Sequence, residues 1–187
     1  EMSDEARAAM VKAIEDSELD YVMDIGFDLP SSKLAVDHAA KYPWCYAAVG
    51  CHPHDTDSMD DMQLALIKGL AKKKKVMAIG EIGLDFHYDH SPRDVQREWF
   101  RRQIRLANEL KMPIAIHSRE ADQEVLDILK EEGAFSDERK SWFPERPDTT
   151  GYVSKQPGTC KDARVLLHCF SGSAELGSQY VKLGATI

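Results

Sequence analysis

Three short apolar runs of the sequence each end on a residue that can bind a metal ion, namely Glu81, His117 and His168. Imidazole nitrogens favour zinc and transition metals, whereas a carboxylate also binds magnesium or manganese and can bridge two ions. The combination predicts a divalent metal site and leaves the identity of the metal open. A single histidine behind a strand is more often a hydrogen-bonded structural group, so the prediction depends on the threefold repetition.

The three runs are typical of buried strands in a parallel sheet. They comprise residues 76–81, 113–117 and 165–168, and each is short and almost continuously apolar up to its last residue. In barrels and open α/β sheets, the carboxyl ends of the strands converge on the active site. We therefore expect three residues that are distant in the sequence to meet at one edge of the sheet.

A fourth predicted strand, residues 44–50, delivers two further histidines to the same edge. His52 and His54 follow it in the segment Gly50-Cys-His-Pro-His-Asp55. Two imidazoles beside an acidic residue can orient a phosphate, contact a metal or transfer a proton. The same letters also fit a turn that is held together by its proline and aspartate.

Two polar residues near these strand ends have two possible roles each. Asp85, four residues after Glu81, either orients a ligand or a metal-bound water from behind, or caps the loop. Arg119 either binds a substrate phosphate through both of its guanidinium nitrogens or forms an ordinary ion pair with a carboxylate. His87 and His90 lie in a polar turn, and we predict no role for them.

Strand and helix signals alternate along the chain, which is the pattern of βα units around a parallel sheet. A helix is predicted at 4–16 and a strand at 20–27, and Ser31 or Ser32 is expected to cap the next helix, which runs to about residue 41. Ser91 is the expected N-cap of a long helix that ends near residue 111, and another helix is predicted over 120–132.

Residues 133–163 interrupt this alternation. The segment is rich in proline and glycine and carries scattered charge and aromatic residues. Connections of this length are uncommon in compact domains. We expect an inserted loop within a single domain that spans residues 1–187.

The composition fits a soluble globular domain and excludes several classes of protein. The chain has 187 residues, 43% of them hydrophobic, and a net charge of −8, which argues against coating nucleic acid by electrostatics alone. No apolar stretch approaches the roughly 20 residues that span a bilayer, so no membrane association is expected. The four cysteines form no CxxC pair, which favours reduced thiols and a cytoplasmic location. No obligate protein partner is evident.

Four segments, in order along the chain, resemble the signatures of the TatD-related metal-dependent hydrolases. The segments are Gly-Cys-His-Pro-His-Asp (50–55), Gly-Glu-Ile-Gly-Leu-Asp-Phe (80–86), Ile-His-Ser-Arg-Glu-Ala (116–121) and Leu-His-Cys-Phe-Ser-Gly (167–172). The resemblance covers nearly the whole chain apart from 133–163. It implies a (β/α)₈ TIM-type barrel of the amidohydrolase-like group, two divalent ions (Mg, Mn or Zn) and a DNA substrate, cleaved by deoxyribonuclease activity that is often 3′ to 5′ exonucleolytic.

The same resemblance implies roles for individual residues. Glu81 would be a catalytic ligand that bridges two ions, with His117 and His168 as further metal ligands. His52 would serve the substrate or the metal as a catalytic residue at the mouth of the site. The substrate-binding residues predicted beside it are His54 and Arg119.

Two features of the family pattern are missing from this sequence. Many relatives carry a His-x-His pair on the first strand, and members generally carry an acidic ligand in a Glu-Thr-Asp segment, and neither occurs here. A (β/α)₈ barrel typically needs about 250 residues, so we expect a barrel without its first strand and its last part. Two alternatives stay open: a metal hydrolase of another ester or amide, including an aminoacyl-nucleic acid, and an inactive fragment with relic ligands whose open edge pairs with another chain.

Overall fold

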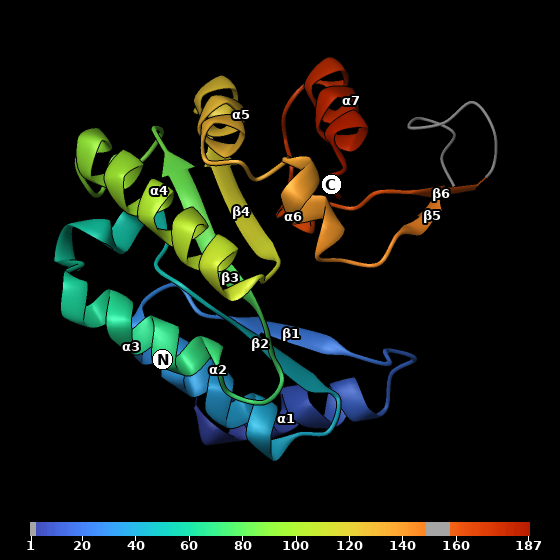
Figure 1. Cartoon of the computed structure of the whole chain (residues 1–187). Helices are drawn as coiled ribbons and strands as arrows, with labels where there is room; N and C mark the ends of the chain where they lie inside the picture. Colours follow the sequence, from blue (N-terminus) through green and yellow to red (C-terminus); the bar gives the residue numbers. More distant parts are fainter. Residues whose placement is uncertain (1–2, 149–157) are drawn as a thin grey trace.

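The protein is built on a five-stranded, wholly parallel sheet with helices packed against it (Figure 1). The computed structural model describes residues 3–148 and 158–187. Neighbouring strands of the sheet follow one another in the order β1-β2-β3-β4-β7, which confirms the predicted alternation of strands and helices. The strands are β1 (Val22–Ile25), β2 (Cys45–Val49), β3 (Val76–Asp85), β4 (Ile114–Arg119) and β7 (Val165–Leu167).

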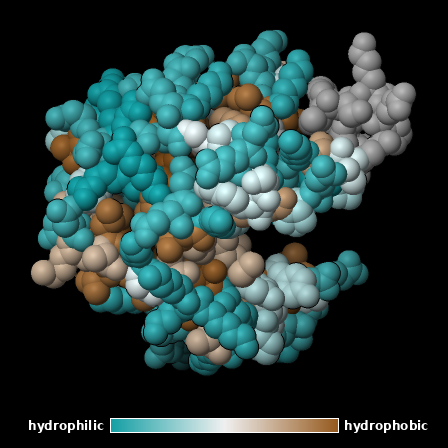
Figure 2. Space-filling model, viewed as in Figure 1, coloured by the Kyte–Doolittle hydropathy of each residue, from teal (hydrophilic) through white to brown (hydrophobic). Residues whose placement is uncertain are grey.

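The helices bury their apolar faces against one side of this sheet. Phe100 and Ile104 of the long fourth helix are fully buried, as are Ile79 and Ile82 of β3. Burying one such side chain stabilises the fold by about 1.5–3 kcal/mol. The outer surface, in the view of Figure 2, is mostly hydrophilic. The main helices are α1 (Asp4–Glu15), α2 (Leu29–Lys41), α3 (Asp61–Ala71), α4 (Arg93–Leu110), α5 (Asp122–Glu131) and α7 (Ala174–Leu183).

The first residues of α2 differ from the prediction that Ser31 or Ser32 caps it. Asp28 is the N-cap, and its carboxylate accepts a hydrogen bond from the backbone N–H of Ser31 at 2.7 Å. The hydroxyl of Ser31 accepts in return from the N–H of Asp28 at 3.0 Å, which completes a capping box. The predicted cap residue therefore belongs to the first turn, because an aspartate three residues earlier already binds its N–H.

Ser91, the predicted N-cap of α4, has a tertiary role instead. The helix begins at Arg93 without a side-chain cap. The Ser91 hydroxyl donates to the carbonyl of His54 at 2.9 Å and accepts from the N–H of Asp57 at 3.1 Å. It thereby ties the start of α4 to the 3₁₀ helix η1 (Pro53–Ser58), which carries His54.

A bulge in β3 makes this strand longer than predicted. From Ile79 to Ile82 the strand advances three residues while its partner β4 advances two, from Ile114 to Ile116. Glu81 therefore lies inside β3, and the predicted end at this residue is wrong. An extra residue of this kind re-aims a side chain and increases the local twist.

Gly83 allows β3 and β4 to approach closely just beyond the bulge. Its φ is 152°, and a Cβ atom on it would lie 1.9 Å from the carbonyl oxygen of His117. No residue with a side chain fits this position. Glycine therefore lets β3 run on to Asp85 beside His117.

The described part of 133–163 holds secondary structure that the predicted inserted loop does not include. It forms α6 (Asp137–Ser141), and β5 (Arg146–Asp148) pairs antiparallel with β6 (Gly158–Cys160). Arg139 is fully buried and donates to the carbonyls of Ala163 and Met112 and to Oδ1 of Asn108, at 2.7–2.9 Å. Residues 149–157 lie outside the described residues, and the insertion itself stays a prediction.

One sheet face is apolar and open at the amino-terminal ends of the strands. Met23, Met77 and Leu166 are partly exposed and line a pocket of about 690 Å³ there. None of the described helices is both long and apolar enough to cross a membrane. All four cysteines are free thiols, as predicted, while the cytoplasmic location stays a prediction.

Candidate metal centre

The predicted site residues converge at the carboxyl-terminal edge of the sheet. Strands β3 and β4 carry four of them, and three more lie in the segments that follow β2 and β7. Arg119 is the last residue of β4 and lies at the rim. The group at the centre consists of His52 and His54 after β2, Glu81 and Asp85 on β3, His117 on β4, and His168 after β7.

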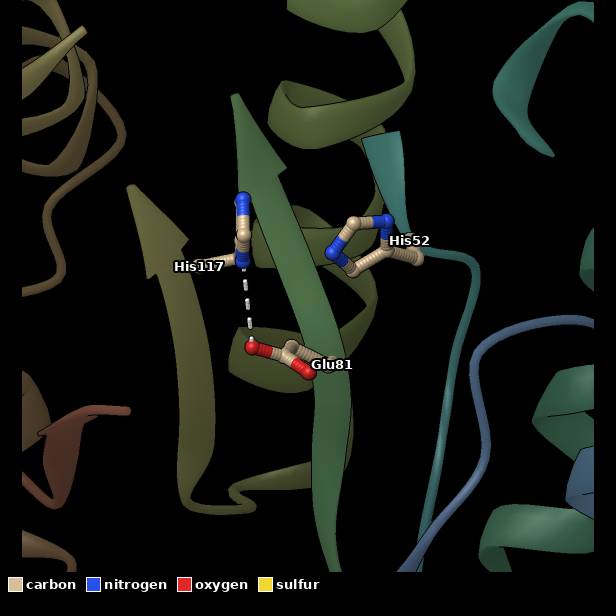
Figure 3. A group of neighbouring side chains, drawn as sticks. All are labelled: His52, Glu81 and His117. Carbon is tan, nitrogen blue, oxygen red and sulfur yellow. Dashed lines mark ion pairs between the residues drawn. The ribbon is translucent and has the colours of Figure 1, made fainter. Parts of the chain in front are cut away.

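Glu81 and two imidazoles form a compact set of donor atoms. One ligand atom from each of His52, Glu81 and His117 lies within 4.8 Å of the others. Figure 3 shows Nδ1 of His117 facing Oε1 of Glu81, a distance of 3.4 Å, with His52 across the strand. Nδ1 of His168 lies 2.8 Å from the same Glu81 oxygen. The donor set, two or three imidazoles around one carboxylate, fits a divalent metal ion of the zinc or manganese type.

Asp85 contacts both the loop after β3 and two histidines of the candidate site. Its Oδ1 accepts from the backbone N–H groups of His87 at 3.1 Å and Tyr88 at 2.9 Å, which caps the loop. Its Oδ2 accepts from Nε2 of His54 at 2.9 Å and Nε2 of His117 at 3.0 Å. Because Nε2 of His117 is held by Asp85, its Nδ1 is directed toward Glu81.

Both carboxylates of the site are held in their ionised form. Burial opposes the charge of Glu81, but hydrogen bonds from His117 and His168 outweigh it and lower its pKa to about 2. Burial likewise opposes the charge of Asp85, whose pKa is lowered to about 2 by the N–H of Tyr88 and by the imidazoles of His54 and His117. At neutral pH both carboxylates are therefore negatively charged.

His52 is a neutral ring that presents a donor. Burial, together with the neighbouring His117, lowers its pKa to about 4. Its Nδ1 accepts a hydrogen bond from the N–H of His54 at 3.2 Å. In a neutral imidazole this bond assigns the ring proton to Nε2, so His52 is arranged to donate to a substrate oxygen. To bind a metal through Nε2, it would have to give up the bond from His54.

A pocket of about 600 Å³ opens beside these residues, and some of the residues that line it were not predicted from the sequence. Phe27, Asp55 and His90 line it together with His52, His54 and Glu81. The ring of His90 lies 4.6 Å from that of His54, so the polar turn to which no role was assigned forms part of the site. Phe27 ends the predicted strand 20–27. The rule that the carboxyl ends of parallel strands converge on the active site therefore also indicates this residue.

Arg119 carries no ion pair to a carboxylate within residues 3–148 and 158–187. Its guanidinium carbon lies 5.2 Å from the ring centroid of Tyr88. Among the described residues, the ordinary ion pair weighed for this arginine is not formed. Within the described residues, the guanidinium at this edge of the sheet makes no ion pair that would occupy its hydrogen-bond donors.

Comparison with known protein families and relatives identifies the group to which these features belong. The family model described as "TatD related DNase" matches residues 1–187. The "Uncharacterized metal-dependent hydrolase YabD" of Bacillus subtilis is 39% identical over 165 residues, which are 88% of this chain and 54% of that protein. The "3'-5' ssDNA/RNA exonuclease TatD" of Klebsiella pneumoniae is 33% identical over 162 residues, 87% of this chain and 52% of that protein. The chain thus spans about half the length of the curated relatives it matches.

Two solved structures share the fold. A TatD homologue, YJJV, from Escherichia coli aligns with a TM-score of 0.73 and 22% identity, over 96% of this chain and 60% of the other. A TatD family hydrolase from Entamoeba histolytica aligns with a TM-score of 0.74 and 22% identity, over 98% and 56%. These alignments confirm the predicted TIM-type barrel, of which the described strands form an open part. The chain belongs to the TatD-related DNase family of metal-dependent hydrolases.

Proposed function

We propose that the protein hydrolyses phosphodiester bonds in DNA, as a metal-dependent exonuclease. The observation that carries the proposal is the shared Glu81 oxygen, which His117 and His168 approach at 3.4 and 2.8 Å beside a neutral His52. The printed name of the Klebsiella relative, a 3'-5' ssDNA/RNA exonuclease, supports a nucleic-acid substrate and a strand end as the point of attack.

The residues that would hold the metal are Glu81, His117 and His168, with His52 as a further candidate. We propose two ions of the Mg, Mn or Zn type, since the two oxygens of a carboxylate can each bind one ion. A bound divalent ion would stabilise charge on the phosphate and lower the pKa of the attacking water. The ionised Glu81 provides the negative charge that retains such an ion.

The remaining residues would bind and orient the substrate. The Nε2 proton of His52 can donate to a phosphate oxygen, and Arg119 can bind a second one through two nitrogens. Asp85 fixes the rings of His54 and His117. With a net charge of −8, the chain needs such local donors to bind a polyanion.

The proposal is tested by replacing Glu81 with glutamine, which keeps the shape and removes the charge. Single-stranded DNA labelled at either end is incubated with Mg²⁺, Mn²⁺ or Zn²⁺ or with a chelator, and the products are resolved by length. We expect Glu81→Gln to reduce metal-dependent cleavage at least about 100-fold with an unchanged circular dichroism spectrum. Glu18→Gln, at an exposed site, is the matched control.

Three outcomes would contradict the proposal. Cleavage by Glu81→Gln with unchanged metal dependence would exclude Glu81 from the reaction. Hydrolysis of an ester or amide panel without DNA cleavage would favour the other hydrolase, and calorimetry that detects no metal binding would favour relic ligands.

A further inference from the structure

Two exposed aromatic rings flank the histidines of the candidate site, and the mechanism above does not use them. Phe27, after β1, is 51% exposed and lines the site pocket. Tyr88, after β3, is 50% exposed, and its ring centroid lies 5.6 Å from that of His54. Since β2 lies between β1 and β3, the two rings stand on opposite sides of the His52–His54 segment.

Both rings are attached to the residues that build the site. The N–H of His52 donates to the carbonyl of Phe27 at 2.7 Å, and the N–H of Tyr88 donates to Asp85 at 2.9 Å. His90 stacks with Tyr88, with the two ring planes 10° apart and their centroids 5.7 Å apart. The backbone segments that carry the two rings are therefore tied to His52 and Asp85.

A cation lies over one of these rings. The guanidinium of Arg119 is 5.2 Å from the Tyr88 ring centroid. Aromatic faces next to a cationic group are the combination by which proteins bind single-stranded nucleic acid, with bases on the rings and phosphates on the cation. Aromatic stacking accepts every base, which suits an enzyme that removes nucleotides irrespective of sequence.

We propose that Phe27 and Tyr88 form two base-stacking subsites, one on each side of the phosphodiester bond that is cleaved. This inference rests on the proposed function, because it assumes a nucleic-acid substrate at the site. The unpaired bases of a single strand stack on the rings, and Arg119 binds the phosphate of the nucleotide that Tyr88 holds. Paired bases offer no free faces, so the subsites select single strands.

The test measures stacking separately from cleavage. The probes are oligothymidylates with 2-aminopurine at one of the last two positions of either end. Stacking quenches the fluorescence of 2-aminopurine. Phosphorothioate linkages block hydrolysis. We expect quenching on wild-type protein at adjacent positions of one end. Tyr88→Leu and Phe27→Leu should each lose quenching at one position and weaken binding about tenfold. On cleavable DNA, KM should rise with little change in kcat.

Controls separate stacking from folding and from general DNA affinity. Tyr88→Phe keeps a ring and should bind as wild type. Tyr21→Leu removes an exposed tyrosine that lies before β1, at the opposite end of this strand from Phe27. An oligonucleotide that is abasic at the probed position should bind wild type and the leucine variants alike. If the DNA binds with fluorescence quenching but is not cleaved, the proposed hydrolysis would be refuted and the stacking subsites would be supported. Cleavage with unchanged quenching and affinity in both leucine variants, or no DNA binding at all, would overturn the subsites.

Discussion

Replacing Asp85 with asparagine should weaken the hydrogen bonds that hold His54 and His117 in place and leave the proposed metal ligands unchanged. An amide keeps the volume of the side chain but offers one accepting oxygen in place of two. Asp85 accepts four hydrogen bonds, from the N–H groups of His87 and Tyr88 and from the rings of His54 and His117. In Asp85→Asn, one amide oxygen can retain only one of these two pairs.

The cost in stability follows from the pKa of Asp85. The side chain is fully buried, and its pKa falls from the ordinary 3.8 to about 2. At about 1.36 kcal/mol per pKa unit, the ionised carboxylate stabilises the fold by about 2 kcal/mol at neutral pH. Loss of two hydrogen bonds to a charged group, at about 1.5–3 kcal/mol each, gives a similar or larger figure.

The sign of the pH dependence is fixed by the direction of this shift. Because the pKa of Asp85 is depressed in the folded state, its contribution is complete well above pH 3.8 and is lost as the pH falls through about 2. At pH 3, about half of the difference between the wild type and Asp85→Asn should remain. Metal affinity should fall about 10- to 100-fold, because His117 loses its orienting partner.

The assay is urea unfolding in the presence of a chelator at pH 7 and pH 3, together with metal titration by calorimetry at pH 7. Asp20→Asn, at an exposed aspartate, is the control. A difference below about 0.5 kcal/mol at pH 7, or one that is the same at both pH values, would refute the account of Asp85.

Three further predictions concern the packing and the metal. Arg139→Met should destabilise the fold by about 4 kcal/mol in urea unfolding, because three buried acceptors lose their donor; a loss under about 1 kcal/mol would contradict this. Gly83→Ala should cost more than about 2 kcal/mol and weaken metal binding in calorimetry, because its Cβ would displace the His117 carbonyl. A metal at 100 times its Kd should stabilise the wild type by about 2.7 kcal/mol and raise its melting temperature, an effect that Glu81→Gln should abolish.

The strand order could be predicted because it depends on local patterns. Apolar runs separated by amphipathic segments predict parallel strands, and the residue placed after the third run, His168, does follow β7. The bulge at Glu81 could not be predicted, because it depends on how β3 pairs with β4, a property of two strands together.

Residues of the candidate site could be predicted where the residue type itself indicates chemistry. They were missed where only the position of the residue in the fold brings it to the site. His52, His54 and His117 carry metal-binding or proton-transferring groups, and they were recognised by type. Phe27 and Tyr88 are ordinary aromatic residues in the sequence, and only their exposed positions beside the histidines distinguish them. Ser91 was misassigned because a serine before a proline is a local signal for a helix start, whereas its partner His54 is 37 residues away.

The bulge of β3 gives this strand one residue more than its partner β4 in the segment that contains Glu81. Loss of a single residue between Ile79 and Ile82 would leave both flanking ladders in register, since β4 advances two residues there and β3 would then do the same. Loss of a residue between Ile82 and Asp85 would turn Asp85 to the opposite face of the strand. Descendants of this sequence could therefore lose the carboxylate of the candidate metal site through one codon deletion and keep the fold, so the barrel could persist without this chemistry.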